Sequence, residues 1–278
     1  MATIARPARL NDLSDPPEVV YGLGDPTILS LPTVTLVGSR RATAYGERIA
    51  TAFGSAFARA GVCVISGLAL GIDVAAQRAA LDAGGRVCAV LGTSVDVSYP
   101  LANRAVQSAI ASTGLLLSEY PPGMGARPWH FPQRNRLMAA LGQATIVIEA
   151  GVNSGALTTA AVALHLGRAV GAVPGNIDSP ESMGSNALLH DLKVSAITDV
   201  ASALALLNVA PFIRQPRLEP DEEAIWRVLP ATSVEDLVRR SALTTARCLS
   251  AMASLELAQA ISIGYDGAIR RNAAGDIT

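Results

Sequence analysis

The chain has 278 residues and is short of lysine, of net charge and of aromatic side chains. Of its 22 basic residues only Lys193 is a lysine, so the other 21 are arginines. A formal net charge of −1 excludes a global positive field that would attract nucleic acid, so any such binding must rest on a local patch. Arginine is a better fork for phosphate than lysine, although a GC-rich genome produces the same bias. Aromatics make up only 4%, which leaves aliphatic side chains to fill the core.

Long hydrophobic runs and cysteine pairs are also missing. No stretch of about 18 apolar residues occurs, and the N-terminus lacks the apolar core of a signal peptide, so we expect a cytoplasmic protein without membrane contact. The cysteines lie far apart without CxxC spacing, and the three histidines are not spaced as metal ligands. The sequence therefore predicts buried free thiols at Cys63, Cys88 and Cys248, and neither a metal nor a cofactor.

What the chain does contain is an alternation of short apolar runs and amphipathic stretches. This pattern predicts an α/β fold, an extended Rossmann-like and mostly parallel sheet with helices on both faces, over residues 33–207. The expected strands are 33–37, 62–65, 87–91, 115–117, 145–149 and 170–173. The expected helices are 43–60, 72–83, 103–112, 134–141, 156–166 and 199–207. Residues 1–32 are rich in Pro and Asp and indicate an entry segment with one short strand near 19–21.

The pattern changes after a proline-rich linker at 208–220. Three short amphipathic helices, 222–228, 233–241 and 244–257, precede a hairpin, 260–263 and 268–271, whose turn contains Asp-Gly. Residues 221–278 are thus expected to form a small winged-helix-like domain. Many such domains bind DNA, but the presumed reading helix carries only Arg247 and the domain begins with several carboxylates, which favours protein contact or packing.

The stretch 33–45 predicts a buried strand, a tight turn and a helix start. Gly38 allows close approach of a ligand to the backbone, and Ser39 and Arg40 follow at the turn. Unpaired N–H groups at the helix start and the Arg40 guanidinium would make an anion site.

Three further glycine-bearing turns follow other strands, and the carboxyl ends of parallel strands share one edge of a sheet. They are 66–73, 149–155 and 173–176. In the second of these, Ser154 and Gly155 open a helix and would again present N–H donors. One such turn is routine; four together favour a ligand that carries phosphate.

A cationic segment, 127–136, interleaves arginines with Trp129, His130 and Phe131, and Arg104 lies upstream. Forks for phosphates beside rings for bases are typical of a site for single-stranded nucleic acid. The alternative is a solvated surface loop bounded by prolines. The predicted nucleic-acid ligands are Gly38, Ser39, Arg40, Arg104, Phe131, Arg134, Asn135, Arg136, Ser154 and Gly155.

Signals for catalysis are thin, and we predict no catalytic residue. No serine lies in a GxSxG turn and no Walker A lysine exists. Glu119 and Glu149 each follow a strand and could form a pair of carboxylates, but we expect them to orient arginines. The alternative function is a nucleotide-binding or nucleoside-monophosphate-hydrolysing enzyme on the same core. Its Pro-Gly-Gly-x-Gly-Thr-x-x-Glu turn is not present at 149–161, where Ala161 stands in place of the glutamate.

In order and spacing the motifs resemble the DprA/Smf family of DNA-processing proteins, from about residue 18 to the end. The matching segments are 37–40, 66–73, 89–92, 99–100, 118–123, 131–136, 147–150, 154–157 and 173–180. The resemblance implies a homodimer that binds single-stranded DNA and helps to load a RecA-type recombinase during DNA uptake in natural transformation. A single-strand-binding protein is a further candidate partner.

Carried over residue by residue, the family's Gly-Ser/Ala-Arg motif falls on 38–40, its Arg-Asn-Arg motif on 134–136 and a basic residue on Arg104. Three departures stand out. Leu101 follows Tyr-Pro where a basic residue is common, Gln77 replaces a usual histidine, and Leu192 and Lys193 replace a usual Gly-Ala pair.

Overall fold

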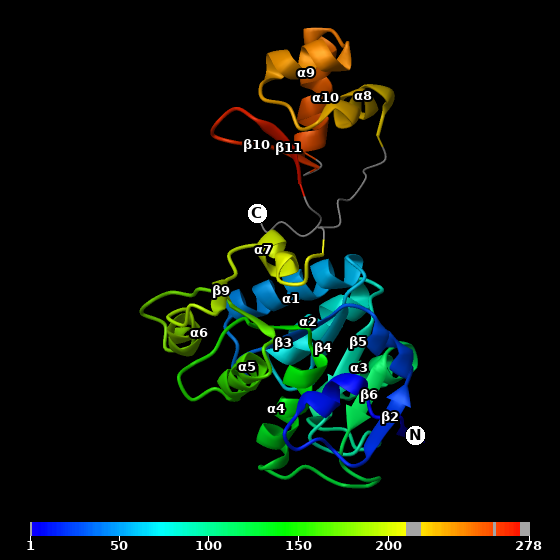
Figure 1. Ribbon diagram of the computed structural model, residues 1–278. Helices are drawn as coiled ribbons and strands as arrows, with labels where there is room; N and C mark the ends of the chain where they lie inside the picture. The colour runs from blue at the N-terminus through cyan, green and yellow to red at the C-terminus, as the bar shows by residue number, and fades with distance from the viewer. Residues whose placement is uncertain (1, 210–217, 258–259, 273–278) are drawn as a thin grey trace. The chain divides into compact units, whose positions relative to one another are not determined.

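The computed structural model describes residues 2–209, 218–257 and 260–272, which form two compact units divided near residue 210 (Figure 1). Most of the predicted linker, 210–217, lies outside the described residues. The predicted domain boundaries therefore stay a prediction.

The first unit is built on a nine-stranded sheet in the order β1-β2-β6-β5-β4-β3-β7-β8-β9. Seven strands from β6 to β9 run parallel, while β2 pairs antiparallel with β6 and β1 antiparallel with β2. The strands are β1 Ala2–Ile4, β2 Val20–Gly24, β3 Thr33–Val37, β4 Cys63–Ser66, β5 Val87–Val90, β6 Leu115–Ser118, β7 Ala144–Val147, β8 Ala169–Ala172 and β9 Val194–Ala196.

Strand β3 is the middle one of the seven parallel strands, and every residue in it is buried. The chain proceeds from β3 to β4, β5 and β6 on one side, and later to β7, β8 and β9 on the other. The direction of winding thus reverses at β3. In such sheets a crevice opens beyond the carboxyl ends of the strands at this reversal, which is where ligands bind.

Helices cover both faces of the sheet and enclose two cores (Figure 1). One face packs against α1, α2, α3 and α7, and the other against α4 and α5. The alternate residues of β3 divide between them, since Val34 and Leu36 face the first core and Val37 faces the second. The helices are α1 Ala44–Arg59, α2 Ile72–Asp82, α3 Arg104–Thr113, α4 His130–Leu141, α5 Gly155–His165, α6 Met183–Leu188 and α7 Val200–Ala205, with short 3-10 turns η1 Ala8–Asp12, η2 Pro26–Ser30 and η3 Leu101–Asn103.

The predicted fold class and its six parallel strands are confirmed, with three differences. Helix α4 begins at His130 rather than 134, so the cationic segment lies partly on its first turn. Residues 2–24 add β1 and β2 to the sheet edge instead of only one short strand. Strand β9 and helix α6 were not predicted, because both are very short.

The second unit contains the predicted three helices and hairpin: α8 Pro220–Val228, α9 Val234–Ser241, α10 Thr245–Leu257, and the strands β10 Ile261–Ile263 and β11 Ile269–Arg271. Its core is formed by side chains from all three helices and the hairpin, among them Trp226, Leu237 and Met252. No helix in the described parts of either unit is long and apolar enough to cross a membrane.

Candidate nucleic-acid interface

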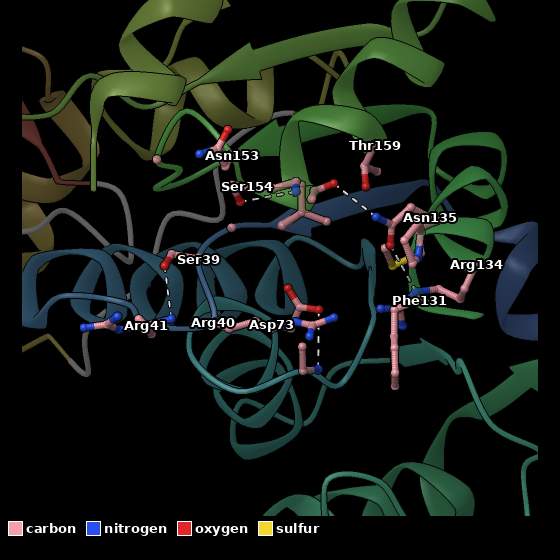
Figure 2. A pocket seen from close by; sticks show the side chains of 18 of the residues that line it. Ser39, Arg40, Arg41, Asp73, Phe131, Arg134, Asn135, Asn153, Ser154 and Thr159 are labelled. Atoms are coloured by element: carbon pink, nitrogen blue, oxygen red, sulfur yellow. Dashed lines mark hydrogen bonds between the residues drawn. The ribbon is translucent and has the colours of Figure 1, made fainter. Parts of the chain in front are cut away.

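A cleft of about 1050 Å³ opens at the carboxyl end of β3, where the winding of the sheet reverses. Three turns that follow β3, β4 and β7 line it, together with α4 and the loop before α4 (Figure 2). Eight of the ten predicted ligands are among its lining residues: Gly38, Ser39, Arg40, Phe131, Arg134, Asn135 and the pair Ser154 and Gly155 that opens α5. Three of the four turns identified separately in the sequence thus meet at one site, whereas the turn at 173–176 is not among its lining residues.

The turn after β3 is fixed to the segments that follow both neighbouring strands, β7 and β4. A Cβ on Gly38 would come within 2.5 Å of Cγ1 of Ile72 and 2.8 Å of the Glu149 carbonyl oxygen, so only glycine fits there. The Ser39 N–H donates to the Glu149 carbonyl at 2.7 Å, and the Ser39 carbonyl accepts from the Ile72 N–H at 3.2 Å. Because the backbone is held in this way, the next residue, Arg40, projects from a rigid base.

Arg40 is exposed and lies over the half-buried ring of Phe131, with 5.1 Å from its guanidinium carbon to the ring centroid. The ring of Tyr99 lies 5.4 Å from that of Phe131. No ion pair or side-chain hydrogen bond of Arg40 occurs within the described residues. A cation placed over an aromatic ring without an acidic partner is open to a ligand that offers both a phosphate and a base.

The start of α1 differs from the prediction, because a buried carboxylate and a threonine hydroxyl already accept hydrogen bonds from some of its backbone N–H groups. The carboxylate of Glu149, which is only 1% exposed, accepts from the Thr43 N–H at 2.8 Å and from the Thr43 hydroxyl at 2.5 Å. The Thr43 hydroxyl oxygen in turn accepts from the Gly46 N–H at 3.2 Å. Glu149 therefore caps α1. The prediction that Glu149 orients an arginine is wrong.

Arg134 forms the floor of the cleft and is not an exposed fork. Its side chain is 3% exposed, and Nη1 donates to the carbonyls of Gly67, at 2.8 Å, and Val90. Burial lowers the pKa of Arg134 to about 10, opposed by the nearby carboxylate of Asp73. Arg134 thereby fastens the ends of β4 and β5, and its donors are largely used inside the protein.

Asp73 holds the turn after β4 from beneath. Its carboxylate accepts from the N–H groups of Gly67 at 3.1 Å and Ala69 at 3.4 Å. Burial raises the pKa of Asp73, and the charge of Arg134 opposes that rise. Asp73 and Arg134 thus both hold the turn after β4 in place.

Two predicted phosphate ligands lie outside the cleft lining. Arg136 points away from it and pairs with Glu119 at 2.5 Å, where burial raises the pKa of Glu119 and Arg136 opposes the rise. Of Glu119 and Glu149, the two glutamates predicted to orient arginines, Glu119 does so. Arg104 is exposed at the start of α3, next to Asn103, whose amide donates to the carbonyl of Leu68 at 2.9 Å. Arg104 therefore lies beside the turn after β4 rather than in the cleft.

The opposite wall is the N-terminus of α5. Ser154 caps it by accepting from the Ala156 N–H at 3.3 Å, and the Asn135 amide donates to the Gly155 carbonyl at 3.1 Å (Figure 2). Thr159 was missed by sequence reasoning, although it lies one helical turn after Gly155 and so shares its face. Its hydroxyl is buried and has no hydrogen-bond partner within the described residues. Arg41 and Asn153 were also missed as lining residues.

The departures from the family pattern have clear positions. Leu101 is 75% exposed in η3, so no basic side chain stands there. Gln77 accepts from the Leu68 N–H at 3.1 Å and donates to the Cys88 carbonyl at 3.2 Å, and so links the turn after β4 to β5. Leu192 is fully exposed beside β9, and the Lys193 N–H donates to Asp191. Among the described residues, no cluster of three His, Cys, Asp or Glu side chains could hold a metal ion.

The second unit gives its arginines internal partners. Arg247 on α10 pairs with Asp221 on α8, and Arg239 and Arg240 on α9 both pair with Asp236. In the hairpin Arg270 pairs with Asp266. Each of these exposed arginines therefore has a carboxylate beside it, and the preference for protein contact or packing over DNA stays a prediction.

The family model described as DNA recombination-mediator protein A matches residues 4–208, and the DprA winged helix domain matches residues 214–264. The chain belongs to this family. A DNA processing protein DprA of Mycobacterium tuberculosis is 38% identical over 264 residues, which cover 90% of this chain and 68% of that relative. The confirmed fold and resemblance make this chain a DNA-processing recombination mediator of the DprA/Smf type.

Two solved structures are similar to the chain. DNA processing protein A of Streptococcus pneumoniae matches with a TM-score of 0.69 and 37% identity, covering 73% of this chain and 71% of that one. DNA processing protein A of Helicobacter pylori matches with a TM-score of 0.69 and 30% identity, covering 75% of this chain and 97% of that one. The latter structure concerns that protein's unique mode of binding single-stranded DNA.

Proposed function

We propose that the cleft binds single-stranded DNA through its phosphates and that the protein delivers this DNA to a RecA-type recombinase during DNA uptake. The observation that carries the proposal is the exposed guanidinium of Arg40, held by a rigid turn over the ring of Phe131 and without an acidic partner among the described residues. Family membership and the Helicobacter pylori relative support the choice of ligand.

In this site Arg40 holds a phosphate, and the bases of the unpaired strand turn toward Phe131 and Tyr99. The wall at Ser154 and Gly155 receives a second phosphate at the start of α5, with Asn135 fixing that wall. Arg134 acts from beneath by holding the cleft open, while Arg104 attracts the strand from outside. Backbone contacts dominate, so little base preference is expected.

The test compares two arginine variants in the same protein. Arg40→Ala should weaken binding of an unstructured oligonucleotide at least tenfold, or about 1.4 kcal/mol, as measured by fluorescence anisotropy. Arg59→Ala removes the same charge from the far end of the 16-residue helix α1, where the side chain is also exposed, and should change the affinity little. Equal losses for both variants, or no loss for Arg40→Ala, would refute the site.

We further propose that the cleft binds rather than hydrolyses its ligand. The carboxylate that the alternative enzyme would need, Glu149, is buried and engaged by Thr43. Incubation with nucleoside monophosphates should therefore release no free base. Release of base that disappears in Glu149→Gln would instead establish the enzyme.

Membership of the family supports the partners that we propose: a recombinase of the RecA type, a single-strand-binding protein and a second copy of this chain, in the cytoplasm. Co-sedimentation of the protein with recombinase filaments on single-stranded DNA tests the first of these. Loading is contradicted if the recombinase nucleates at the same rate with and without the protein.

A further inference from the structure

Trp129 lies immediately outside the cleft and is 60% exposed, an unusual position for one of only two tryptophans in a chain so poor in aromatics. The residues before it, Arg127 and Pro128, line the cleft itself. The guanidinium carbon of Arg127 lies 5.6 Å from the centroid of the Trp129 ring. A strand that leaves the cleft past Arg127 therefore meets Trp129 next.

The ring of Trp129 is held in place from the protein side. It packs edge-on against His130, with centroids 5.9 Å apart and planes at 84°, and His130 stacks on Tyr120 at 3.9 Å. His130 is anchored by a 3.0 Å hydrogen bond to the Gly92 carbonyl oxygen, and both His130 and Tyr120 are buried. An exposed ring on a buried aromatic support keeps its orientation without a ligand, so binding to it orders little that is not already ordered.

We propose that Arg127 and Trp129 form a second binding site for the same strand, in which an unpaired base stacks on the indole while Arg127 meets the adjoining phosphate. The inference rests on the proposed function, because the strand must first occupy the cleft. Every base has a flat face, so this site would hold a strand of any sequence, and paired bases in a duplex could not reach it. It also supplies affinity that does not depend on charge at position 101, where this chain has Leu101.

The experiment uses the full chain carrying Trp226→Phe, which leaves Trp129 as its only tryptophan. Trp226 is 7% exposed in the core of the second unit, so this change should not touch the cleft. The emission of Trp129 is followed while oligothymidines of about three and about ten nucleotides are added, lengths chosen so that only the longer can extend beyond a single site. The longer strand should quench the emission and the shorter one should leave it nearly unchanged.

Affinity gives the second readout. Trp129→Ala should weaken the longer strand about tenfold, since stacking of one base contributes about 1–3 kcal/mol, and should leave the shorter strand unaffected. Trp129→Phe should recover most of the loss. A longer strand with abasic sites in place of its outer bases should bind equally well to the Trp129→Ala variant and to the unaltered protein.

Other outcomes overturn the inference in distinguishable ways. If Arg40→Ala weakens both strands but Trp129→Ala weakens neither, the cleft binds DNA and Trp129 has no part in it. If Arg40→Ala also has no effect, the proposed function itself fails. If Trp129→Ala leaves DNA binding intact but reduces co-sedimentation with the recombinase, the exposed ring serves a protein partner instead.

Discussion

In the second unit the arginines at positions 227, 239, 240, 247 and 270 each pair with a carboxylate, whereas the exposed arginines that line the cleft of the first unit have no such pair within the described residues. Arg40, Arg41 and Arg104 are exposed and have no ion pair or side-chain hydrogen bond within the described residues. Both units are rich in arginine, so composition does not decide which arginines can bind a phosphate. The placement of acidic residues decides it.

Within the first unit a second contrast separates exposed arginines from buried ones. Arg134 is surrounded by carbonyl oxygens and by Asp73, and it supports the cleft from below. Arg40 is exposed: backbone hydrogen bonds hold its turn, and its guanidinium lies over the ring of Phe131. Loss of Arg134 should therefore damage the fold, and loss of Arg40 should damage binding only.

Arg134→Met gives the largest expected effect. Removing the Arg134 charge leaves the buried Asp73 without the positive group that offsets its burial, which should lower the free energy of unfolding of the first unit by about 3 kcal/mol. Urea unfolding followed by circular dichroism measures this loss. The double variant with Asp73→Asn should recover part of it, whereas Arg247→Met in the exposed pair of the second unit should change little. A small loss for Arg134→Met would erase the contrast between buried and exposed arginines.

The next largest effect is expected from one of two glycine substitutions, which lie at opposite walls of the cleft and should differ in their effect on stability and binding. Gly38→Ala forces a Cβ against backbone and Ile72 and should destabilise by about 2 kcal/mol while disrupting the turn that holds Arg40. At Gly155 the nearest atom to an added Cβ is Nδ2 of Asn135 at 3.6 Å, an ordinary contact, so Gly155→Ala should keep both stability and binding. Thermal unfolding and oligonucleotide affinity are measured for both. Equal behaviour would mean that the turn after β3 is not rigid.

The pH dependence of stability tests the buried Asp73. Burial raises its pKa in the folded state above the unfolded value, so the folded state binds the proton more tightly. This contribution to stability is present below the ordinary pKa of an aspartate and is lost as the pH rises through the raised value. The difference in free energy of unfolding between Asp73→Asn and the unaltered protein should therefore shift in favour of the variant over that range. A difference that is constant with pH would place the carboxylate in contact with water.

How far the sequence could predict this arrangement differs from residue to residue. The turn at 38–40 was predictable because its glycine, its strand and its helix are neighbours in the chain, and the winding of a parallel sheet brings strand ends together. The capping of α1 by Glu149 was not, because the two are more than a hundred positions apart and a carboxylate after a strand fits several roles. The different roles of Arg134 and Arg136, which are two positions apart on α4, could not be predicted either. Helical spacing directs them to different faces, but only tertiary packing decides which face is buried.

The smallest expected effect comes from a variant that tests whether an arginine without its acidic partner is enough to bind DNA. Asp221→Asn removes the partner of Arg247 on α10 without adding a positive side chain. If the placement of acids alone keeps the second unit from binding, the variant should bind oligonucleotides about twofold more tightly at low salt. The slope of log K against log salt should also steepen by about 0.7 for one added phosphate contact on a single strand. An unchanged slope would show that α10 lacks more than a free charge, since its exposed side chains include Leu249 and Leu257 where a DNA-reading helix carries polar groups.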